Sequence, residues 1–374
     1  MRYHFFHLLL TSRSSTLFKK HTETAYPYWF NPWGTLVHME NQFLLAGDIG
    51  GTKTILALFS SEKGPLQPLF EVIYASTAYP GLDAIIKDFF SQADVSASTA
   101  CFGVAGPVRD GRSVITNLPW QPDTRILQSS HGFSKVSLIN DLVATGYAIP
   151  HLSRSDLFII NAGINTNEGG IGIIAPGTGL GEAIFTWEGS RYTPVPSEGG
   201  HTDFAPIAEI EVDLLAFLNK RYGHVSYDRI CSGRGLPGIY DFIKAHFQLE
   251  EPDWLTRELE NAEDRTPVIV NAALNDTKPC IICSKTLQMF ISILGAEAGN
   301  LALKGLTTGG MYLGGGIPPR ILPFLQTETF MTSFTNKGRM SYLLNDIPVK
   351  VILNPKAALI GAASYGLGLK FKTI

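Results

Sequence analysis

Two short segments of the sequence carry side chains that could bind a hydroxylated ligand and move a proton. Asn140 and Asp141 stand side by side directly after an apolar stretch, and Asp141 could act as a general base. Glu198 and His201 lie in one glycine-bearing loop, where each could exchange hydrogen bonds with neighbouring hydroxyl groups. Together the two segments predict a site that recognises a sugar.

Simpler explanations of these residues stay open at this point. Asn140 or Asp141 could merely cap the helix expected after them, because Asn and Asp are preferred at that position. The Glu198–His201 loop could instead bind a metal, but zinc normally needs three or four protein ligands, and the nearby chain offers no matching His or Cys pair.

The first of three glycine clusters, residues 47–54, could hold a phosphate chain. Adjacent Gly50 and Gly51 allow positive φ and close backbone approach, so successive amides could converge on an anion. A P-loop is excluded because Thr52 stands where that motif needs glycine, and a strand, not a helix, follows. Asp48 could hold a hydrated Mg²⁺ against the phosphates.

Two further clusters extend this nucleotide hypothesis. Residues 175–181 form a second glycine turn, in which Thr178 adds a hydroxyl group. Residues 309–316 could let an adenine and a ribose lie against bare backbone. Each cluster alone is also explained by an ordinary tight turn, whereas the three together favour a nucleotide.

The elements that would position these residues belong to an α/β protein. The expected strands and helices alternate along the chain. Strand, glycine turn and strand occur twice, which suggests two related halves that face a cleft. The expected strands are 43–46, 55–59, 100–105, 136–139, 171–175 and 183–185, and the expected helices are 82–90, 142–149 and 287–303.

The composition sets limits on the kind of protein. The 374 residues, 45% of them hydrophobic, suggest two domains with a sizeable core. A formal charge of −3 argues against nucleic acid as a partner, and no apolar run is long enough to predict a membrane span. The four cysteines are too few for a disulfide framework and indicate a reducing compartment. Cys280 and Cys283 have redox spacing but are expected to pack in the core.

Residues 1–38 differ from the rest of the chain. They carry four Lys or Arg residues and one acid, and they show no clean helical or strand period. We expect an extension outside the fold, explained by an upstream start codon before Met39; a transit peptide is the alternative, and secretion is not expected.

The motifs, in their order and spacing, resemble those of the bacterial glucokinase family, in the branch typified by enterobacterial glucokinase. The resemblance runs from about Phe43 to the C-terminus. It is carried by GDIGGTKT at Gly47, GVAGPV at Gly103, TNLPW at Thr116, LINDL at Leu138, APGTGLG at Ala175, PSEGGHTDFAP at Pro196, SYDRICSGRGL at Ser226 and GGMYLGGGIPPR at Gly309.

The resemblance implies a role for each matching residue. It implies that Asp141 is the catalytic base, that glucose is bound by Asn140, Asp141, Glu198, His201 and Asp228, and that ATP is used with Mg²⁺. The phosphates of ATP would lie on Gly47, Asp48, Ile49, Gly50, Gly51, Thr52, Gly177, Thr178 and Gly179. Asp228 is a departure, because the family has a glutamate there; a carboxyl group one methylene shorter could change affinity or epimer selectivity.

The family resemblance also implies the architecture. We expect the two-domain, actin-like ATPase (ribonuclease H-like) fold with an interdomain cleft. The small domain would be residues 39–150 completed by 354–374, and the large domain 151–353. A cytoplasmic homodimer is implied in the same way.

The function expected is ATP-dependent phosphorylation of glucose at its 6-hydroxyl. A kinase of another hexose or of an amino sugar is the first alternative, since the same loop could bind several sugars. A sugar-responsive regulator without catalysis and an actin-like filament or chaperone ATPase are the others. No basic DNA-binding segment supports the regulator.

Overall fold

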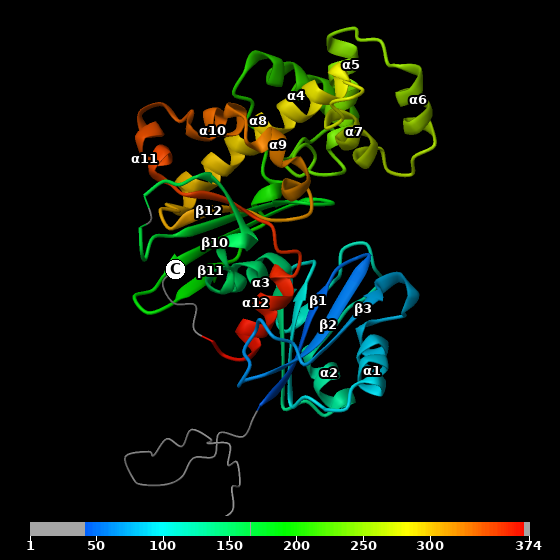
Figure 1. Ribbon diagram of the computed structural model, residues 1–374, viewed down its shortest axis with the longest axis vertical. Coiled ribbons are helices and arrows are strands. Elements are labelled where there is room, and N and C mark those ends of the chain that lie inside the picture. Colours follow the sequence, from blue (N-terminus) through cyan, green and yellow to red (C-terminus); the bar gives the residue numbers. More distant parts are fainter. Residues whose placement is uncertain (1–41, 165, 370–374) are drawn as a thin grey trace, which may run out of the picture. The chain divides into compact units, whose positions relative to one another are not determined.

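The computed structural model describes residues 42–164 and 166–369, which contain two β-sheets with helices packed on them (Figure 1). The expectations for residues 1–38 lie outside the described residues. The strands of the first sheet, in spatial order, are β3 (Phe70–Ala75), β2 (Lys53–Ser60), β1 (Phe43–Ile49), β4 (Thr99–Val104) and β7 (Lys135–Asn140). Those of the second sheet are β11 (Tyr192–Val195), β10 (Leu180–Trp187), β9 (Ile171–Pro176), β12 (Gly310–Leu313), β13 (Val349–Ile352) and β8 (Leu157–Asn161).

The two sheets share one pattern of strand pairing. In the first, β1 and β2 form an antiparallel hairpin, and β4 and β7 then add in parallel to β1. In the second, β9 and β10 form the hairpin, and β12 and β13 add in parallel to β9. The predicted repeat of strand, glycine turn and strand is therefore confirmed, and a short hairpin of β5 (Val108–Arg109) and β6 (Arg112–Ser113) stands apart.

Both faces of the first sheet are covered, which explains why its central strands read as continuous apolar runs. One face packs with side chains of α1 (Leu82–Gln92) and α2 (Thr124–His131). The other packs with α3 (Asp141–Ala148) and α12 (Ala357–Gly366). Neighbouring residues of β1 alternate accordingly, with Leu45 in the first cluster and Leu44 in the second.

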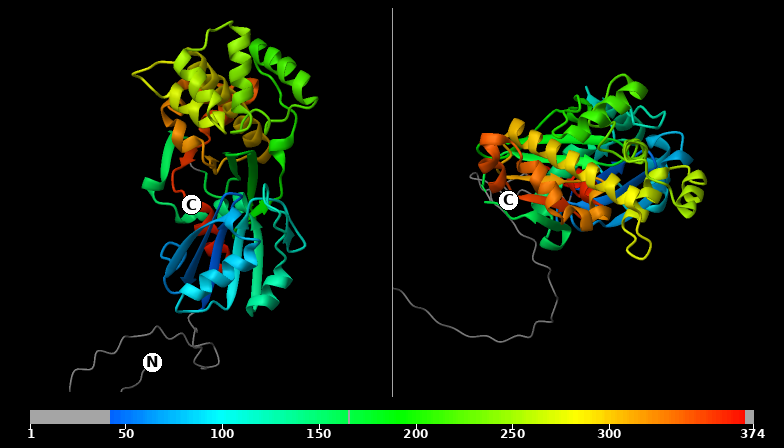
Figure 2. Two further views of the ribbon diagram at one scale, coloured as in Figure 1. Left: turned by 90° about the vertical axis from the view of Figure 1, so that its right-hand side faces the viewer. Right: turned by 90° about the horizontal axis from the view of Figure 1, so that it is seen from above.

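The second sheet has its own core on the face away from the first sheet. Figure 2 shows the helices between β11 and β13 gathered there. They are α4 (Glu209–Tyr222), α5 (Leu236–His246), α6 (Asp253–Glu260), α7 (Arg265–Ala273), α8 (Ile281–Gly305), α9 (Leu322–Leu325), α10 (Glu328–Thr335) and α11 (Ser341–Asp346). Single 3₁₀ turns occupy Ser76–Ala78, Ile149–His151, Arg154–Asp156, Gly199–His201, Pro318–Ile321 and Gly338–Met340.

Helix α8 is the central element of this core. By length and hydropathy it could cross a bilayer, but 72% of its most apolar window is buried inside the protein, as in the core helix of a globular domain. Cys280 precedes the helix and Cys283 lies in its first turn; both are buried and free, as are Cys101 and Cys231. The predicted packing role of the Cys280–Cys283 pair is thus confirmed.

Helices α3 and α12 lie between the sheets and pack on each other (Figure 1). Their buried side chains join clusters on both sheets: Ala144 and Leu359 contact the first, and Ala148 and Ile360 the second. The C-terminal helix therefore returns to the N-terminal sheet. Any displacement of α12 must shift α3, whose first residue is Asp141.

Gly361 sets the distance between these two helices, so we expect Gly361→Ala to destabilise the protein. A Cβ at this position would lie 1.6 Å from the carbonyl oxygen of Ala144, which is backbone and cannot rotate away. Overpacking costs typically about 1–3 kcal/mol, to be measured as a lower free energy of unfolding in urea. Gly81→Ala is the matched control, because a Cβ there meets open space at extended φ. Equal stability of the two variants would contradict the tight α3–α12 packing.

Candidate active site

A cavity of about 490 Å³ lies where the loops at the ends of strands from both sheets face each other. The first sheet contributes the β1–β2 turn, the loop after β4, and the start of α3; the second contributes the β9–β10 turn and the loop after β11. The cavity brings together eleven of the residues predicted from sequence: Asn140, Asp141, Glu198, His201, Asp228, Gly50, Gly51, Thr52, Gly177, Thr178 and Gly179.

Three residues predicted to hold phosphates lie outside the turn and do not line this cavity. Gly47, Asp48 and Ile49 belong to strand β1, and the turn comprises only residues 50–52. The sequence analysis ended the strand too early because it took a glycine and an aspartate for turn residues. Gly47 is glycine for packing, since a Cβ there would lie 2.7 Å from side-chain atoms of Leu56 and Phe102.

Gly51 and Gly179, one in each of the two glycine turns, serve close approach of the backbone. Neither Gly50 nor Gly51 has positive φ, so the first turn does not use that freedom of its glycines. A Cβ on Gly51 would lie 2.9 Å from the carbonyl oxygen of Thr116, and one on Gly179 would lie 2.5 Å from Oδ1 of Asp228. The chain passes so near its neighbours that a side chain has no room.

Backbone hydrogen bonds limit which amides in these turns can bind an anion. The Gly50 N–H donates to the carbonyl of Lys53 at 3.0 Å, and the Gly177 N–H donates to the carbonyl of Gly179 at 2.8 Å. Those two donors are already used. The amides of Gly51 and Thr52 in one turn, and of Thr178 and Gly179 in the other, are the better candidates for phosphate ligands.

Asn140 closes strand β7 and is the N-cap of α3. Its Oδ1 accepts hydrogen bonds from the amides of Leu142 and Val143 at 2.9 and 3.3 Å, and its Nδ2 donates to the carbonyl of Gly106 at 3.3 Å. The capping role that the sequence analysis left open is therefore correct for Asn140, which also lines the cavity. These bonds fix the start of α3.

Asp141 is the first residue of α3, next to the cap. One carboxylate oxygen accepts a hydrogen bond from the amide of Leu142 at 3.0 Å. Burial, together with the nearby charge of Asp48, raises the pKa of Asp141 to about 7, and burial raises the pKa of Asp48 to about 6. A carboxyl group that titrates near neutral pH is suited to general base catalysis.

The loop that follows β11 presents Glu198 and His201 as exposed side chains on the cavity wall. Gly199–His201 forms a single 3₁₀ turn, closed by hydrogen bonds from the His201 N–H to the carbonyl of Glu198 and from the Thr202 N–H to that of Gly199. The glycines are required: a Cβ on Gly200 would overlap the carbonyl oxygen of Leu180. The loop is thus held against β10.

Asp228 joins the second glycine turn, residues 175–181, to this loop. Its Oδ1 accepts a hydrogen bond from the Leu180 N–H at 2.7 Å, and its own N–H donates to the carbonyl of Gly200 at 2.7 Å. The carboxyl group of Asp228 thus braces the start of β10 while it lines the cavity.

A second cavity, of about 600 Å³, adjoins the first at Gly177 and Thr178. The sequence analysis missed most of its walls. They come from α7 and its N-cap, the loop after β12 and the turn around Gly233, and include Arg234, Asp264, Thr266, Pro267, Val270, Asn271, Ile317 and Arg320. The only sequence feature that pointed to these walls was the SGRGL segment at Ser232. The third glycine cluster links the two cavities, since Gly315 lines the first and Gly316 the second.

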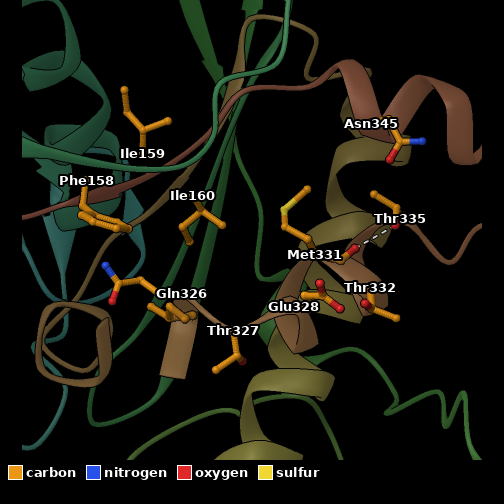
Figure 3. Close-up of a pocket in the computed structure, with 11 residues that line it drawn as sticks. Phe158, Ile159, Ile160, Gln326, Thr327, Glu328, Met331, Thr332, Thr335 and Asn345 are labelled. Atoms are coloured by element: carbon orange, nitrogen blue, oxygen red, sulfur yellow. Dashed lines mark hydrogen bonds between the residues drawn. The ribbon is translucent and has the colours of Figure 1, made fainter. Parts of the chain in front are cut away.

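A third cavity, of about 460 Å³, contains none of the predicted residues. Figure 3 shows Phe158, Ile159 and Ile160 of the edge strand β8 on one side and residues of α10, among them Met331 and Thr335, on the other. It has no titratable pair and no glycine turn, and it is separate from the cavity that contains Asp141.

Comparison with known proteins identifies the family. The family model described as Glucokinase matches residues 45–368. The chain belongs to the glucokinase family. The glucokinase of Nostoc punctiforme is 44% identical over 332 residues, covering 86% of this chain and 97% of that protein. The glucokinase of Pectobacterium atrosepticum is 33% identical, covering 86% and 96%.

A solved structure agrees with the fold. The crystal structure of a glucokinase from an Antarctic psychrotroph superposes with a TM-score of 0.76 at 30% identity, covering 88% of this chain and all of that one. The predicted two-domain, actin-like fold is confirmed. Membership of the family makes the chain an ATP-dependent kinase of glucose, as the motifs predicted.

Proposed function

We propose that Asp141 is the general base with which the chain transfers the γ-phosphoryl group of ATP to the 6-hydroxyl of glucose. One observation carries the proposal: a single cavity is lined by Asp141, by both glycine turns and by the loop that carries Glu198 and His201. A proton acceptor, a place for phosphates and a set of hydroxyl ligands therefore adjoin each other, which is the arrangement that phosphoryl transfer to a sugar needs.

The reaction balances with this one base. Asp141 accepts the proton of the sugar hydroxyl as that oxygen forms its bond to the γ-phosphorus. The bond from the γ-phosphorus to the bridging oxygen breaks, and its electron pair leaves with ADP. No covalent enzyme intermediate is needed. The amides of the glycine turns stabilise the negative charge that spreads over the phosphoryl oxygens.

The remaining predicted residues receive roles in the same proposal. Glucose is bound by Asn140, Glu198, His201 and Asp228, beside Asp141. The phosphates lie on the two turns, with Gly47 and Ile49 shaping the strand before the first turn. The adenosine part of ATP occupies the second cavity, which shares Gly177 and Thr178 with the first.

Asp48 is the residue we propose to hold Mg²⁺ through water. Within residues 42–164 and 166–369, no group of three His, Cys, Asp or Glu side chains is arranged as a metal cage. A hydrated ion that takes one carboxylate and the phosphates fits this donor set, because Mg²⁺ usually keeps several waters. Burial raises the pKa of Asp48, and a nearby cation would lower it again by favouring the charged form. Bound Mg²⁺ would supply charge stabilisation to the phosphates.

Domain closure, assembly and location extend the proposal. The domains are residues 39–150 with 354–374, and 151–353, and we propose that they close on glucose. Closure would exclude water, a competing nucleophile. Support comes from the cavity, whose walls belong to both sheets.

A homodimer in the cytoplasm is proposed from the family resemblance.

A coupled assay with ATP and Mg²⁺ across glucose, mannose, fructose and N-acetylglucosamine tests the substrate. Glucose is expected to have the highest kcat/KM. A higher value for another sugar would favour the kinase of a different hexose or amino sugar, and sugar binding without turnover would favour the regulator. ATP hydrolysis that is independent of sugar and unchanged in Asp141→Asn would favour a filament or chaperone ATPase.

The pH dependence tests the electrostatic coupling. We expect kcat/KM for glucose to fall as the pH drops through about 7, because the protonated form of Asp141 cannot accept the proton. Asp48→Asn removes the neighbouring negative charge. The fall of kcat/KM on the acid side of the profile, the acid limb, should therefore move to lower pH, whatever the effect of the substitution on the maximum rate. The profile is measured with MgATP well below its KM.

Glu258→Gln, an exposed change in α6, is the control and should leave the acid limb where it is. An acid limb that stays in place in Asp48→Asn would contradict the coupling between Asp48 and Asp141.

A further inference from the structure

Arg234 is the one Lys or Arg side chain that lines the cavity containing Asp141, within the part of the chain that the structure describes. It also lines the second cavity, beside Gly177 and Thr178. An ATP molecule with its adenosine in one cavity and its terminal phosphate beside Asp141 in the other would have to pass this side chain. Its position is thus the boundary between the two cavities.

The backbone around Arg234 is fixed to the second phosphate turn. The Gly233 N–H donates to the carbonyl of Gly177 at 2.8 Å, and the Arg234 N–H donates to the carbonyl of Thr178 at 3.4 Å. On the other side, the hydroxyl of Thr266 in α7 donates to the carbonyl of Gly233 at 2.5 Å. The backbone of Arg234 is therefore held in a fixed position next to the turn that we propose for the phosphates.

The side chain of Arg234 reaches across the cleft to the first half of the chain. Its Nη2 donates a hydrogen bond of 2.6 Å to Oδ1 of Asn117, which lies in the loop between β6 and α2. Asn117 has a φ of 66°, in the left-handed region where asparagine is among the few residues tolerated. This bond links the loop after the β5–β6 hairpin to the segment between α4 and α5.

The bond to Asn117 leaves the charge of Arg234 unneutralised. Its partner is a neutral amide, and within the described residues Arg234 forms no ion pair. A guanidinium group binds phosphate oxygens through paired, charge-assisted hydrogen bonds that are about twice as strong as neutral ones. A phosphate in the cleft would therefore compete successfully with the amide.

We propose that Arg234 is a catalytic residue that leaves Asn117 to bind the terminal phosphoryl group of ATP. This inference rests on the proposed function. The guanidinium stays charged throughout and exchanges no proton; it stabilises the charge on the phosphoryl oxygens during transfer. Because binding of the phosphate breaks the bond to Asn117, nucleotide binding is also coupled to the position of the two halves of the chain relative to each other.

Calorimetry with Mg²⁺ and either AMPPNP or ADP, without sugar, tests the contact. For Arg234→Ala we expect AMPPNP affinity to fall at least tenfold while ADP affinity stays within about threefold, because ADP lacks the terminal phosphate. In the coupled assay kcat should fall about 10²- to 10³-fold, the usual loss when one donor to the reacting group is removed. Arg234→Lys should recover part of both losses.

Arg229→Ala is the matched control. Arg229 lies in the same loop, contacts the Tyr222 ring and lines neither cavity, so its removal should leave both affinities unchanged. Asn117→Gly should keep or raise AMPPNP affinity, since glycine tolerates the left-handed φ of this position and removes the competing partner. A loss in Asn117→Gly equal to that in Arg234→Ala would overturn the proposal and make the bridge purely structural.

Other outcomes also decide the question. Equal losses of AMPPNP and ADP affinity, or an unchanged kcat in Arg234→Ala, would overturn the proposal. The wild-type protein is assayed first with glucose. If it binds AMPPNP through Arg234 but does not phosphorylate glucose, the proposed function fails and the phosphate contact stands.

Discussion

Replacing Asp141 by asparagine is expected to lower kcat for glucose phosphorylation by about 10²- to 10⁴-fold, the range that a general base contributes. Asparagine has nearly the same shape, so hydrogen bonding to the sugar should survive in part. The side chain can no longer accept the proton of the 6-hydroxyl. Steady-state kinetics would give kcat, and calorimetry would give the glucose affinity.

The stability of Asp141→Asn separates lost chemistry from lost folding. The negative charges of Asp48 and Asp141 repel each other in the folded protein, as the raised pKa of Asp141 indicates. Removing one charge should therefore leave the melting temperature equal or higher at pH 8. Asp94→Asn, an exposed change in the loop before β4, is the control for both measurements. Wild-type turnover in Asp141→Asn would refute its role as base.

The parts of the site that the sequence predicted are those with local signals. Apolar runs on both sides of a glycine turn predict a buried hairpin, and the β1–β2 and β9–β10 hairpins have that form. Asn140 and Asp141 were placed correctly at the end of a strand because an apolar run precedes them and a helical period follows.

The parts of the site that could not be predicted from the sequence depend on contacts between distant segments of the chain. Nothing in the sequence near Arg234 indicates that it meets Asn117, 117 positions away. Asp264, Thr266 and Asn271 line the second cavity only because α7 packs beside Gly233, which is hydrogen-bonded to the second glycine turn. Strand β1 extends through Gly47 and Asp48 because the sheet on both sides leaves no room for a bend.

A buried pair of carboxyl groups, also unforeseen, lies under the loop that carries Glu198 and His201. Glu182 of β10 is 5% exposed, Glu297 of α8 is fully buried, and the charge of Glu297 acts on the carboxyl group of Glu182. A Cβ on Gly199 would overlap the carboxyl group of Glu182, so this group contacts the backbone of the loop. The pair connects the core helix to the proposed sugar site.

The pair keeps one proton at neutral pH. Burial, and then the charge of Glu297, raises the pKa of Glu182 well above its usual value. Glu297 accepts a hydrogen bond of 2.8 Å from Nδ2 of Asn300 and lies 3.6 Å from Nζ of Lys304. We therefore assign the proton to Glu182, whose pKa is the raised one.

Glu182→Gln is accordingly expected to stabilise the protein at high pH. In the wild type, the folded state holds a proton that the unfolded chain loses above the usual glutamate pKa, so stability falls as the pH rises toward the raised pKa of Glu182. Glutamine has nearly the same shape and stays uncharged at every pH. Free energies of unfolding in urea should agree near pH 5 and favour Glu182→Gln by a few kcal/mol at pH 9, since each unit of pKa shift is worth about 1.4 kcal/mol. Glu258→Gln should change neither value, and a Glu182→Gln protein that loses stability at high pH as steeply as the wild type would show that Glu182 is not the protonated member of the pair.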